Sequence, residues 1–440
     1  MVWVEVDTLR VDALGCYGNQ DVGEGGARTS PHADALAAEG VLFERAYATA
    51  PWTIPSLVSQ FTGLYPHEHG ALRILEPVDP DLVTVPERFR AAGWRTAGVV
   101  TNLVTRGAYG FDQGFERWDD RLARGHEGST AHEAVDVLLG FADELADGPD
   151  AQLFLFLLLF EPHYRYEEHP GGRFGPGWGG GPAYAGPLTG EEELPELRTR
   201  LAALDGADAA FLRGRYLGEV ARADDALGRL LDGLRQRGWY DDALILFTAD
   251  HGEELLERGW LGHTTTLHDE LVRVPLILRP PGLAEELRGT RAPHAVSQVD
   301  LAATLTTLAG IGDGGARGFA DLIVGGRPPR RHLLLHSDFE PPLASDEARR
   351  KRTHLWGVVD GESGRKWIVD HLPGGEPGAP VASLYDLESD PGEERDLAGL
   401  DPAAWAAARD LWIVRGLLPE PLGSRGGGEP IPAGAAESDP

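Results

Sequence analysis

The sequence of 440 residues contains a single cysteine, Cys16, so no disulfide bond can form within the chain. A chain without disulfides fits a reducing compartment. The opening residues, Met1–Val6, form a strand-like run and not the basic and then apolar segments of a signal peptide. We therefore expect a cytoplasmic protein by default, or an exported one if the sequence lacks its original N-terminus.

Long apolar runs and positive charge are also scarce. The most apolar segment, Leu153–Phe160, is far shorter than the about 20 residues that cross a bilayer, so no membrane span is predicted. The 40 Lys and Arg residues against 70 Asp and Glu residues give a net charge of −30. A nucleic-acid partner needs a basic footprint and is not expected. A small anionic substrate is compatible with this charge, because a local site can be positive inside an acidic protein.

Apolar residues make up 42% of the chain and charged residues 25%, which allows a large core. Short apolar runs bounded by turn or helix signals predict five buried strands, at Val2–Val6, Thr96–Val100, Leu153–Phe160, Ala243–Phe247 and Val274–Leu278. Helical patterns lie between them, and the clearest runs from about Ala207 to Arg237. Strands alternating with helices predict an α/β fold, with a doubly wound, mostly parallel central sheet flanked by helices.

The C-terminal part of the chain has a different pattern. Residues Thr353 to Leu387 form short strand-like pieces separated by turns, which predicts a small α+β subdomain with antiparallel strands. We expect a catalytic α/β domain at 1–315, this subdomain at 316–422 and a disordered tail rich in Gly, Pro, Ala and Glu at 423–440. The sequence carries no signal for the oligomeric state.

Acidic residues and a histidine follow two of the predicted strands. Asp7 comes directly after Val2–Val6, and Asp250 and His251 come shortly after Ala243–Phe247. Ligands of a doubly wound sheet bind beyond the carboxyl ends of its strands, so these residues are candidate metal ligands. The alternative is structural, with the two aspartates capping turns or a helix and His251 lying at the surface.

A hydroxyl residue and several histidines add to the pattern. Thr53 opens a predicted helix through Gln60, where backbone N–H groups and the helix dipole favour an anion, although Thr53 or Ser56 could simply cap that helix. His163 follows the strand Leu153–Phe160. A lone histidine is more often structural than catalytic, but its position after a strand favours a role in the site for His163.

Seven segments, in order along the chain, resemble the sulfatase family of the alkaline phosphatase superfamily. They are Val6–Gly18, Thr29–Gly40, Pro51–Gly70, Phe160–Tyr164, Phe247–Glu253, Leu267–Pro275 and Leu384–Glu394. The matches cover about residues 1 to 400. The resemblance implies an alkaline-phosphatase-like fold and a metal-dependent ester hydrolase of the EC 3.1 type.

The resemblance also implies a metal site. Asp7, Asp250 and His251 match positions that bind one divalent metal, and Thr53 matches the nucleophile that faces this metal. The family usually carries Asp-Asp and Asp-Asn where this chain has Asp7-Thr8 and Asp250-His251. Fewer carboxylates and one imidazole shift the expected metal from Ca²⁺ towards Mn²⁺, Zn²⁺ or Mg²⁺.

Four further positions match residues that act on the substrate. His163 and His263 would contact the substrate oxyanion or protonate the leaving group. Asn102 and His69 match substrate-binding positions. These roles are implied by the resemblance alone.

The nucleophile segment departs from the family pattern. Sulfatases oxidise a Cys or Ser in the motif Cys/Ser-x-Pro-x-Arg to formylglycine, whereas this chain reads Thr53-Ile-Pro-Ser-Leu57. A threonine hydroxyl is on a branched carbon and does not give formylglycine, so we expect none. Threonine with an Asp-His pair resembles the phosphodiesterase and phosphoglycerol-transferase branches of the superfamily.

These departures favour a hydrolase or transferase in which Thr53 attacks a phosphoric ester and forms a phosphothreonine. A second hypothesis is a sulfuric ester hydrolase that works without formylglycine. A third is a degenerate, non-catalytic member that binds an anion or a partner.

Overall fold

The computed structural model describes residues 1–125, 130–148, 151–168, 174–175, 183–190, 192–312, 318–324, 326, 332–341, 352–373 and 380–398. Residues 1–396 form one compact unit. The expected boundary between residues 315 and 316 stays a prediction. The expected tail at 423–440 lies outside the described residues.

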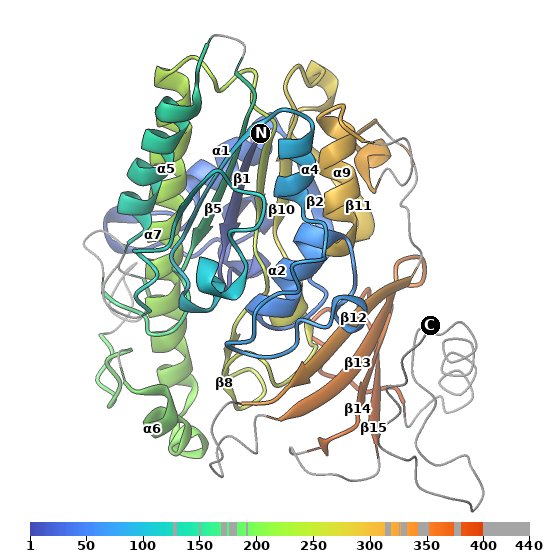
Figure 1. The fold of residues 1–440 in the computed structure, drawn as a ribbon. Coiled ribbons are helices and arrows are strands. Elements are labelled where there is room, and N and C mark those ends of the chain that lie inside the picture. The colour runs from blue at the N-terminus through green and yellow to red at the C-terminus, as the bar shows by residue number, and fades with distance from the viewer. Residues whose placement is uncertain are drawn as a thin grey trace, which may run out of the picture. The chain divides into compact units, whose positions relative to one another are not determined.

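A nine-stranded sheet runs through this unit (Figure 1), in the order β11-β2-β10-β6-β1-β5-β3-β4, with β9 paired to β2. Its strands are β1 Val2–Val6, β2 Val41–Tyr47, β3 Arg95–Val100, β4 Arg117–Asp119, β5 Leu153–Leu159, β6 Ile245–Thr248, β9 Arg273–Val274, β10 Leu276–Arg279 and β11 Thr290–Ser297. β10 pairs antiparallel with β6 and β2, β9 pairs antiparallel with β2, and the other pairs are parallel. The predicted mostly parallel α/β sheet is confirmed.

The centre of the sheet is buried on both faces and, apart from Glu5 of β1, is apolar. Every residue of β1 is buried, and its neighbour β5 is an unbroken run of leucine and phenylalanine. Such runs are typical of parallel strands covered on both sides. The Trp3 ring makes edge-to-face contacts with Phe61 and Phe156 at ring-centre distances of 5.4 and 5.5 Å. This packing fixes β1, and with it the Asp7 that follows.

Two predictions about strands need correction. The predicted strand Val274–Leu278 is split between β9 and β10 at Pro275, because proline has no N–H for a strand ladder. β2, β4 and β11 were not predicted at all. In β11 the pairing with β2 shifts register between Ala292 and Ala295, and such an irregularity breaks the two-residue alternation that identifies a strand.

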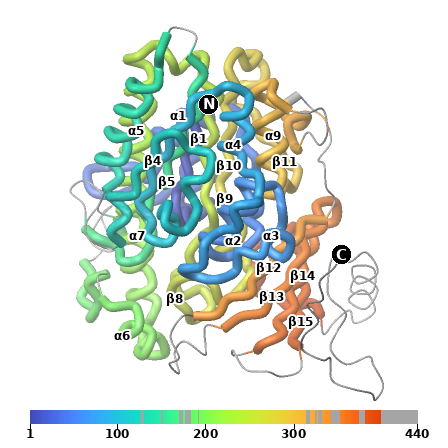
Figure 2. The backbone as a smooth tube through the Cα atoms, in the orientation of Figure 1, coloured from blue at the N-terminus to red at the C-terminus, as the bar shows by residue number. Residues whose placement is uncertain are grey.

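Helices cover both faces of the sheet (Figures 1 and 2). α1, α5 and α7 pack together on one face, and α2, α4 and α9 pack together on the other. These helices are α1 Pro31–Glu39, α2 Thr53–Thr62, α4 Val85–Ala91, α5 Ala131–Leu145, α7 Gly206–Gln236 and α9 Leu301–Leu308; the short ones are α3 Pro66–His69, α6 Leu194–Arg198 and α8 Asp269–Val272. The longest predicted helix is confirmed as α7. A reciprocal capping box of Asp205 and Asp208 caps its N-terminus. None of the described helices combines the length and the apolar character that a bilayer crossing requires.

A second sheet holds four antiparallel strands in the order β12-β13-β14-β15, which confirms the small C-terminal subdomain. They are β12 His332–Phe339, β13 Thr353–Asp360, β14 Arg365–Asp370 and β15 Val381–Asp386, and a separate two-stranded hairpin joins β7 Glu254–Leu255 to β8 Leu261–Gly262. One face of the four-stranded sheet, with Leu335, Leu355 and Ile368, is buried against Leu267 and Leu271. The small sheet therefore shares a core with the segment around α8.

A buried lysine fastens this sheet to the same segment. Lys366 of β14 is fully buried, and its Nζ lies 2.8 Å from Asp269 Oδ1 and 3.0 Å from Glu393 Oε1. Glu393 also accepts a hydrogen bond of 2.6 Å from the backbone N–H of Asp269. The two carboxylates raise the pKa of Lys366 although burial alone would lower it. The three charges hold together segments that are far apart in the sequence.

We expect Lys366→Ala to lower the free energy of unfolding by about 3–5 kcal/mol, because it leaves two carboxylates buried without their cation. The measurement is denaturation by urea. The control is Arg365→Ala on the same strand, where the side chain is half-buried and the expected change is within about 0.5 kcal/mol. Equal effects of the two substitutions would show that the buried ion pairs contribute little.

Candidate active site

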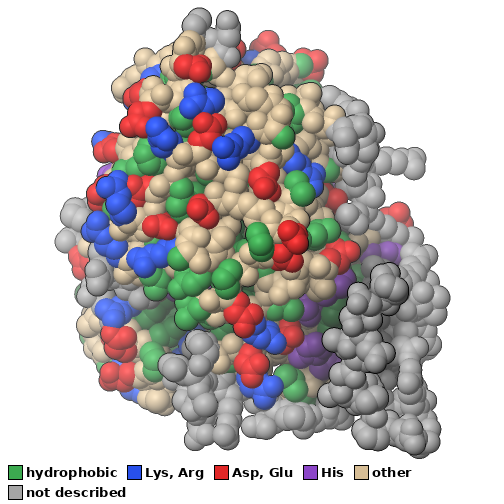
Figure 3. All heavy atoms as spheres, in the orientation of Figure 1, with side chains coloured by type: hydrophobic (Ala, Val, Ile, Leu, Met, Phe, Trp, Pro, Cys, Tyr) green, Lys and Arg blue, Asp and Glu red, His purple; other side chains and the backbone are tan. Residues whose placement is uncertain are grey.

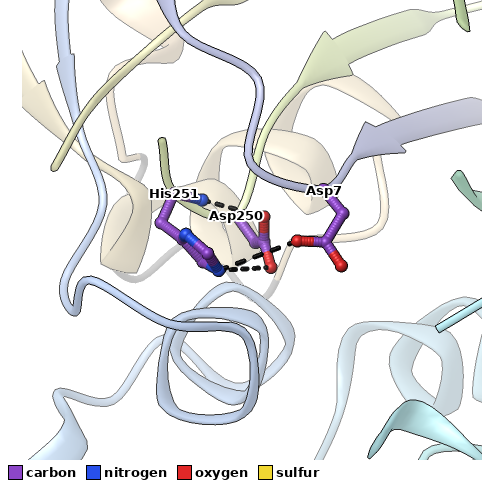
Figure 4. Close-up of side chains that lie close together, drawn as sticks. All are labelled: Asp7, Asp250 and His251. Atoms are coloured by element: carbon purple, nitrogen blue, oxygen red, sulfur yellow. Dashed lines mark hydrogen bonds and ion pairs between the residues drawn. The ribbon is translucent and has the colours of Figure 1, made fainter. Parts of the chain in front are cut away.

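Three of the predicted metal ligands converge at the carboxyl ends of β1 and β6. The side chains of Asp7, Asp250 and His251 point towards one another (Figure 4), and one ligand atom from each lies within 4.8 Å of the others. His251 Nε2 is 3.7 Å from Asp7 Oδ1 and 3.4 Å from Asp250 Oδ2. All three side chains are fully buried. The parallel pairing of β1 with β6 brings their ends together, as expected for the ligand-binding edge of a doubly wound sheet.

The atoms that face the centre of this cluster suit a metal ion. Within the described part of the chain, Asp7 Oδ1 and Asp250 Oδ2 have no hydrogen-bond partner, although both are buried. His251 Nδ1 lies 2.8 Å from the carbonyl oxygen of Gly252, so this nitrogen carries the proton. In the neutral imidazole Nε2 is then the acceptor, and it faces the two carboxylates. Buried polar atoms are almost always satisfied, and a divalent cation would satisfy these three at once.

The charge balance of the cluster leads to the same conclusion. Burial, and next the negative charge of Asp250, raise the pKa of Asp7 well above its usual value. Burial also raises the pKa of Asp250. Among the described residues, His251 is the one basic side chain that pairs with either carboxylate. A bound cation would offset both negative charges and reverse these shifts.

The backbone holds the cluster in place. The N–H groups of Thr8 and His251 both donate to Asp250 Oδ1, at 3.2 and 2.9 Å, which turns the other carboxylate oxygen towards Asp7. Gly252 allows the next turn, because a Cβ there would lie 2.0 Å from the carbonyl oxygen of Glu270. The sequence Asp250-His251-Gly252 thus combines two candidate ligands with a glycine. Only glycine leaves room there for the carbonyl oxygen of Glu270.

Thr53 lies beside the cluster as the resemblance implied. It is the first residue of α2, it is nearly fully buried, and its Oγ1 lies 3.3 Å from His251 Nε2. When His251 is neutral with its proton on Nδ1, the threonine hydroxyl donates this hydrogen bond. Neither proposed helix cap is formed: no side chain caps the N-terminus of α2, and the Ser56 hydroxyl donates to the carbonyl of Asp250 at 2.5 Å. Ser56 thereby fastens the helix that carries Thr53 to the metal-ligand turn.

Asn102, predicted to bind substrate, contacts a candidate metal ligand. Its Nδ2 donates to Asp7 Oδ2, the carboxylate oxygen that faces away from His251. Its Oδ1 accepts the N–H of Val104 at 2.9 Å and so caps a short 3-10 turn at Leu103–Thr105. These contacts orient Asp7, and a direct role for Asn102 in substrate binding stays a prediction.

His263 and His163, both predicted to act on the substrate, lie one after the other beside His251 of the cluster. The ring of His263 lies 4.6 Å from that of His251, and the ring of His163 lies 5.0 Å from that of His263. His163 also stacks on Phe160 at 4.5 Å. The structure therefore brings both predicted histidines to the side of the cluster.

A carboxylate that was not predicted holds one of these histidines. Glu253 is fully buried, and its Oε1 lies 2.9 Å from His263 Nδ1. The backbone N–H of Tyr164 donates to its other oxygen at 3.3 Å. Burial raises the pKa of Glu253. The signal was present in the sequence, since Glu253 directly follows the Asp-His-Gly turn, but the spacing alone did not show which histidine it contacts.

Among the described residues, no contact joins His69 to this group. Its Nε2 lies 3.1 Å from the carbonyl oxygen of Pro55 and 3.1 Å from Ser59 Oγ, and its Nδ1 accepts the N–H of Ala71 at 3.1 Å. Burial lowers the pKa of His69 to about 4, so the ring is neutral. These bonds fasten α3 to α2, and a role in substrate binding stays a prediction.

The comparisons with known proteins identify the family of the chain. The family model described as Sulfatase matches residues 1–311. The chain belongs to the sulfatase family. It is an ester hydrolase of that family, and the candidate active site lies within the matched residues.

Individual relatives of the sulfatase family differ in the chemistry that their names record. The N-acetylglucosamine-6-O-sulfatase of Bacteroides thetaiotaomicron is 24% identical over 71% of this chain and 68% of its own length. The multifunctional alkaline phosphatase superfamily protein PehA of Trinickia caryophylli is 29% identical to this chain. The match covers 48% of this chain and 40% of PehA. The phosphonate monoester hydrolase of Agrobacterium radiobacter has the same fold, with a TM-score of 0.69, 24% identity and coverage of 94% of both chains.

A metal-binding measurement tests the cluster of this sulfatase-family site. We expect the purified chain to bind Mn²⁺ with Asp7, Asp250 and His251, and Asp250→Asn to weaken this binding by about 100-fold or more, because it removes a charged ligand. Equilibrium dialysis against Mn²⁺ measures the affinity. Asp242→Asn, at an exposed aspartate, is the control with unchanged affinity. Equal affinities of the two variants would exclude Asp250 as a ligand.

Proposed function

We propose that this chain cleaves phosphoric esters with Thr53 as the nucleophile and one divalent metal bound by Asp7, Asp250 and His251. The observation that carries the proposal is the position of the Thr53 hydroxyl, 3.3 Å from His251 Nε2 at the buried cluster. Thr53 also begins α2, where backbone N–H groups of the first turn favour an anionic group. A hydroxyl in this place is set to attack an ester that binds against the cluster.

The bound metal would lower the pKa of the Thr53 hydroxyl and offset charge on the phosphoryl oxygens. Thr53 loses its proton to solvent, and its oxygen then forms a bond to phosphorus while the bond from phosphorus to the leaving oxygen breaks. His263 gives a proton to that leaving oxygen, and Glu253 holds His263 in place for this transfer. The product is a phosphothreonine and a released alcohol.

The second half of the reaction regenerates the chain. Water, or an acceptor alcohol, attacks phosphorus and loses its proton to His263, which is unprotonated after the first half. The bond between phosphorus and the Thr53 oxygen breaks, and this oxygen takes up a proton. His163, whose ring lies 5.0 Å from that of His263, would bind an oxygen of the transferred group.

Cleavage of sulfuric esters is the second candidate. Its support is the family itself and the relatives named as sulfatases. Thr53 is compatible with it only if sulfate transfer proceeds without formylglycine. A non-catalytic role is less well supported, because two fully buried carboxylates facing an imidazole are costly to keep without a bound cation.

Substitution of the nucleophile tests the proposal. We expect Thr53→Ala to lower kcat for a phosphodiester by about 1,000-fold or more, since no other group replaces the attacking hydroxyl. Thr53→Ser keeps the hydroxyl and is expected to retain activity. Thr62→Ala, at the last residue of the same helix, is the control for damage to α2. The assay uses an aryl phosphate, a phosphodiester and an aryl sulfate, each with Mn²⁺ and with Zn²⁺.

Mass spectrometry of acid-quenched reactions is expected to find phosphate on the peptide that contains Thr53. Turnover of the aryl sulfate alone would support the second candidate. Absence of metal binding and of turnover on all three substrates would support the non-catalytic one. Full phosphodiesterase activity of Thr53→Ala would disprove the nucleophile.

The contact between Glu253 and His263 gives a separate expectation. Glu253→Gln keeps the size of the side chain but removes the charge that stabilises protonated His263, so kcat is expected to fall by about 10- to 100-fold. Mn²⁺ affinity is expected to fall far less than in Asp250→Asn, because Glu253 is not among the three ligands and acts on Asp7 only through its charge. Steady-state kinetics with the phosphodiester, beside Mn²⁺ dialysis, measures both. A loss of metal together with activity would mean that Glu253 acts on the cluster and not on His263.

A further inference from the structure

One face of the small sheet carries histidines that the active site does not use. In the register of β12 with β13, His336 lies opposite Trp356, and Asp338 lies opposite His354. Their strand neighbours Leu335 and Leu355 point to the buried side of the sheet. Histidine side chains gather over this part of the surface in Figure 3. His67, from α3, joins them above the sheet.

The rings are spaced like imidazoles that share an ion. The ring centres of His67 and His336 are 6.1 Å apart, and those of His336 and His354 are also 6.1 Å apart. Two imidazoles bound to one Zn²⁺ at about 2.1 Å place their ring centres about 5–6 Å apart. Both distances lie close to this range.

His336 provides an independent observation. Its side chain is 3% exposed, and within the described residues its Nδ1 has no hydrogen-bond partner. Burial favours the neutral form of an imidazole, which is the form that binds metals. A buried nitrogen in this state requires a partner, and bound ions are among the partners that satisfy such atoms.

Asp338 adds a carboxylate next to the rings. Its Oδ1 lies 3.9 Å from His354 Nδ1. Asp338 and His336 are two residues apart on β12 and so share one face, while His354 is the cross-strand neighbour of Asp338. Side chains in these relative positions have Cβ atoms close enough to meet at one point.

We propose that His67, His336, Asp338 and His354 bind a transition-metal ion of the Zn²⁺ class at a second site, apart from the active site. Imidazole with one carboxylate suits Zn²⁺ and its neighbours in the series, whereas Mg²⁺ and Ca²⁺ prefer oxygen ligands. Four protein ligands leave no open position, which is typical of a structural and not a catalytic site.

Binding requires the rings to turn. In the part of the chain that the structure describes, the Asp7 cluster is the one set with three ligand atoms already within 4.8 Å. The imidazoles of His67, His336 and His354 would rotate about their Cα–Cβ bonds to meet one ion, without a change of strand register. His371 lies 5.2 Å from His354, but on the side of β13 that faces away from β12, so we do not include it.

The position of this ion gives it a structural consequence. It would join α3 to β12 and β13, and α3 is already bound to α2 through His69. α2 carries Thr53 at its first residue. The ion would thus stabilise the helix pair that holds the proposed nucleophile, whatever ester the active site cleaves.

Zinc counting tests the proposal on the full, untagged chain. The protein is stripped with a chelator and dialysed against buffered Zn²⁺, and bound zinc is measured by mass spectrometry. We expect two zinc ions per chain, one at the active site and one at the second site. His67→Ala and His354→Ala should each lose the zinc of the second site, whereas Asp250→Asn should keep it. His67 is exposed and His354 half-buried, so these variants are expected to fold. Unchanged Mn²⁺ binding at the active site verifies that they do.

His294→Ala, at an exposed histidine of β11, is the matched control and should keep the full zinc content. The proposal is overturned if His67→Ala and His354→Ala bind as much zinc as the unchanged chain. It is also overturned if Asp250→Asn removes all bound zinc, because the active site is then the only zinc site of the chain.

Discussion

The repulsion between two buried carboxylates is the constraint on which the site depends. Asp7 and Asp250 end neighbouring strands, so the sheet that gives the fold its core also forces their negative charges together. Backbone N–H groups and Asn102 satisfy the outer oxygens and leave the inner ones to a cation. A metal would therefore complete the charge balance of the folded chain as well as serve its chemistry.

The central part of this arrangement could be predicted from the sequence. The strands before Asp7 and Asp250 are continuous apolar runs, and their carboxyl ends meet at one edge in a parallel sheet. β2 and β11 could not be predicted in the same way. The bulge in β11 conceals its periodicity, and its pairing with β2 joins segments about 250 residues apart.

The contacts of single side chains were harder to predict than the strands. Motif spacing places Asn102, His69 and Glu253 near the site, but it does not specify which atom each one binds. Asn102 contacts Asp7, His69 bonds to α2, and Glu253 holds His263. Each outcome depends on a few ångströms of packing between elements that are distant in the sequence, and a single sequence does not contain that information.

The small sheet contacts the segment that carries His263. Thr264 follows His263 with a φ of +87°, a strained conformation for a β-branched residue. Its N–H donates to the carbonyl of Pro51, and its own carbonyl accepts a hydrogen bond from Thr353 of β13. Two hydrogen bonds therefore hold Thr264 in this conformation, one to the segment before Thr53 and one to the small sheet. Because His263 precedes this strained residue, its position relative to Thr53 depends on the docking of both sheets.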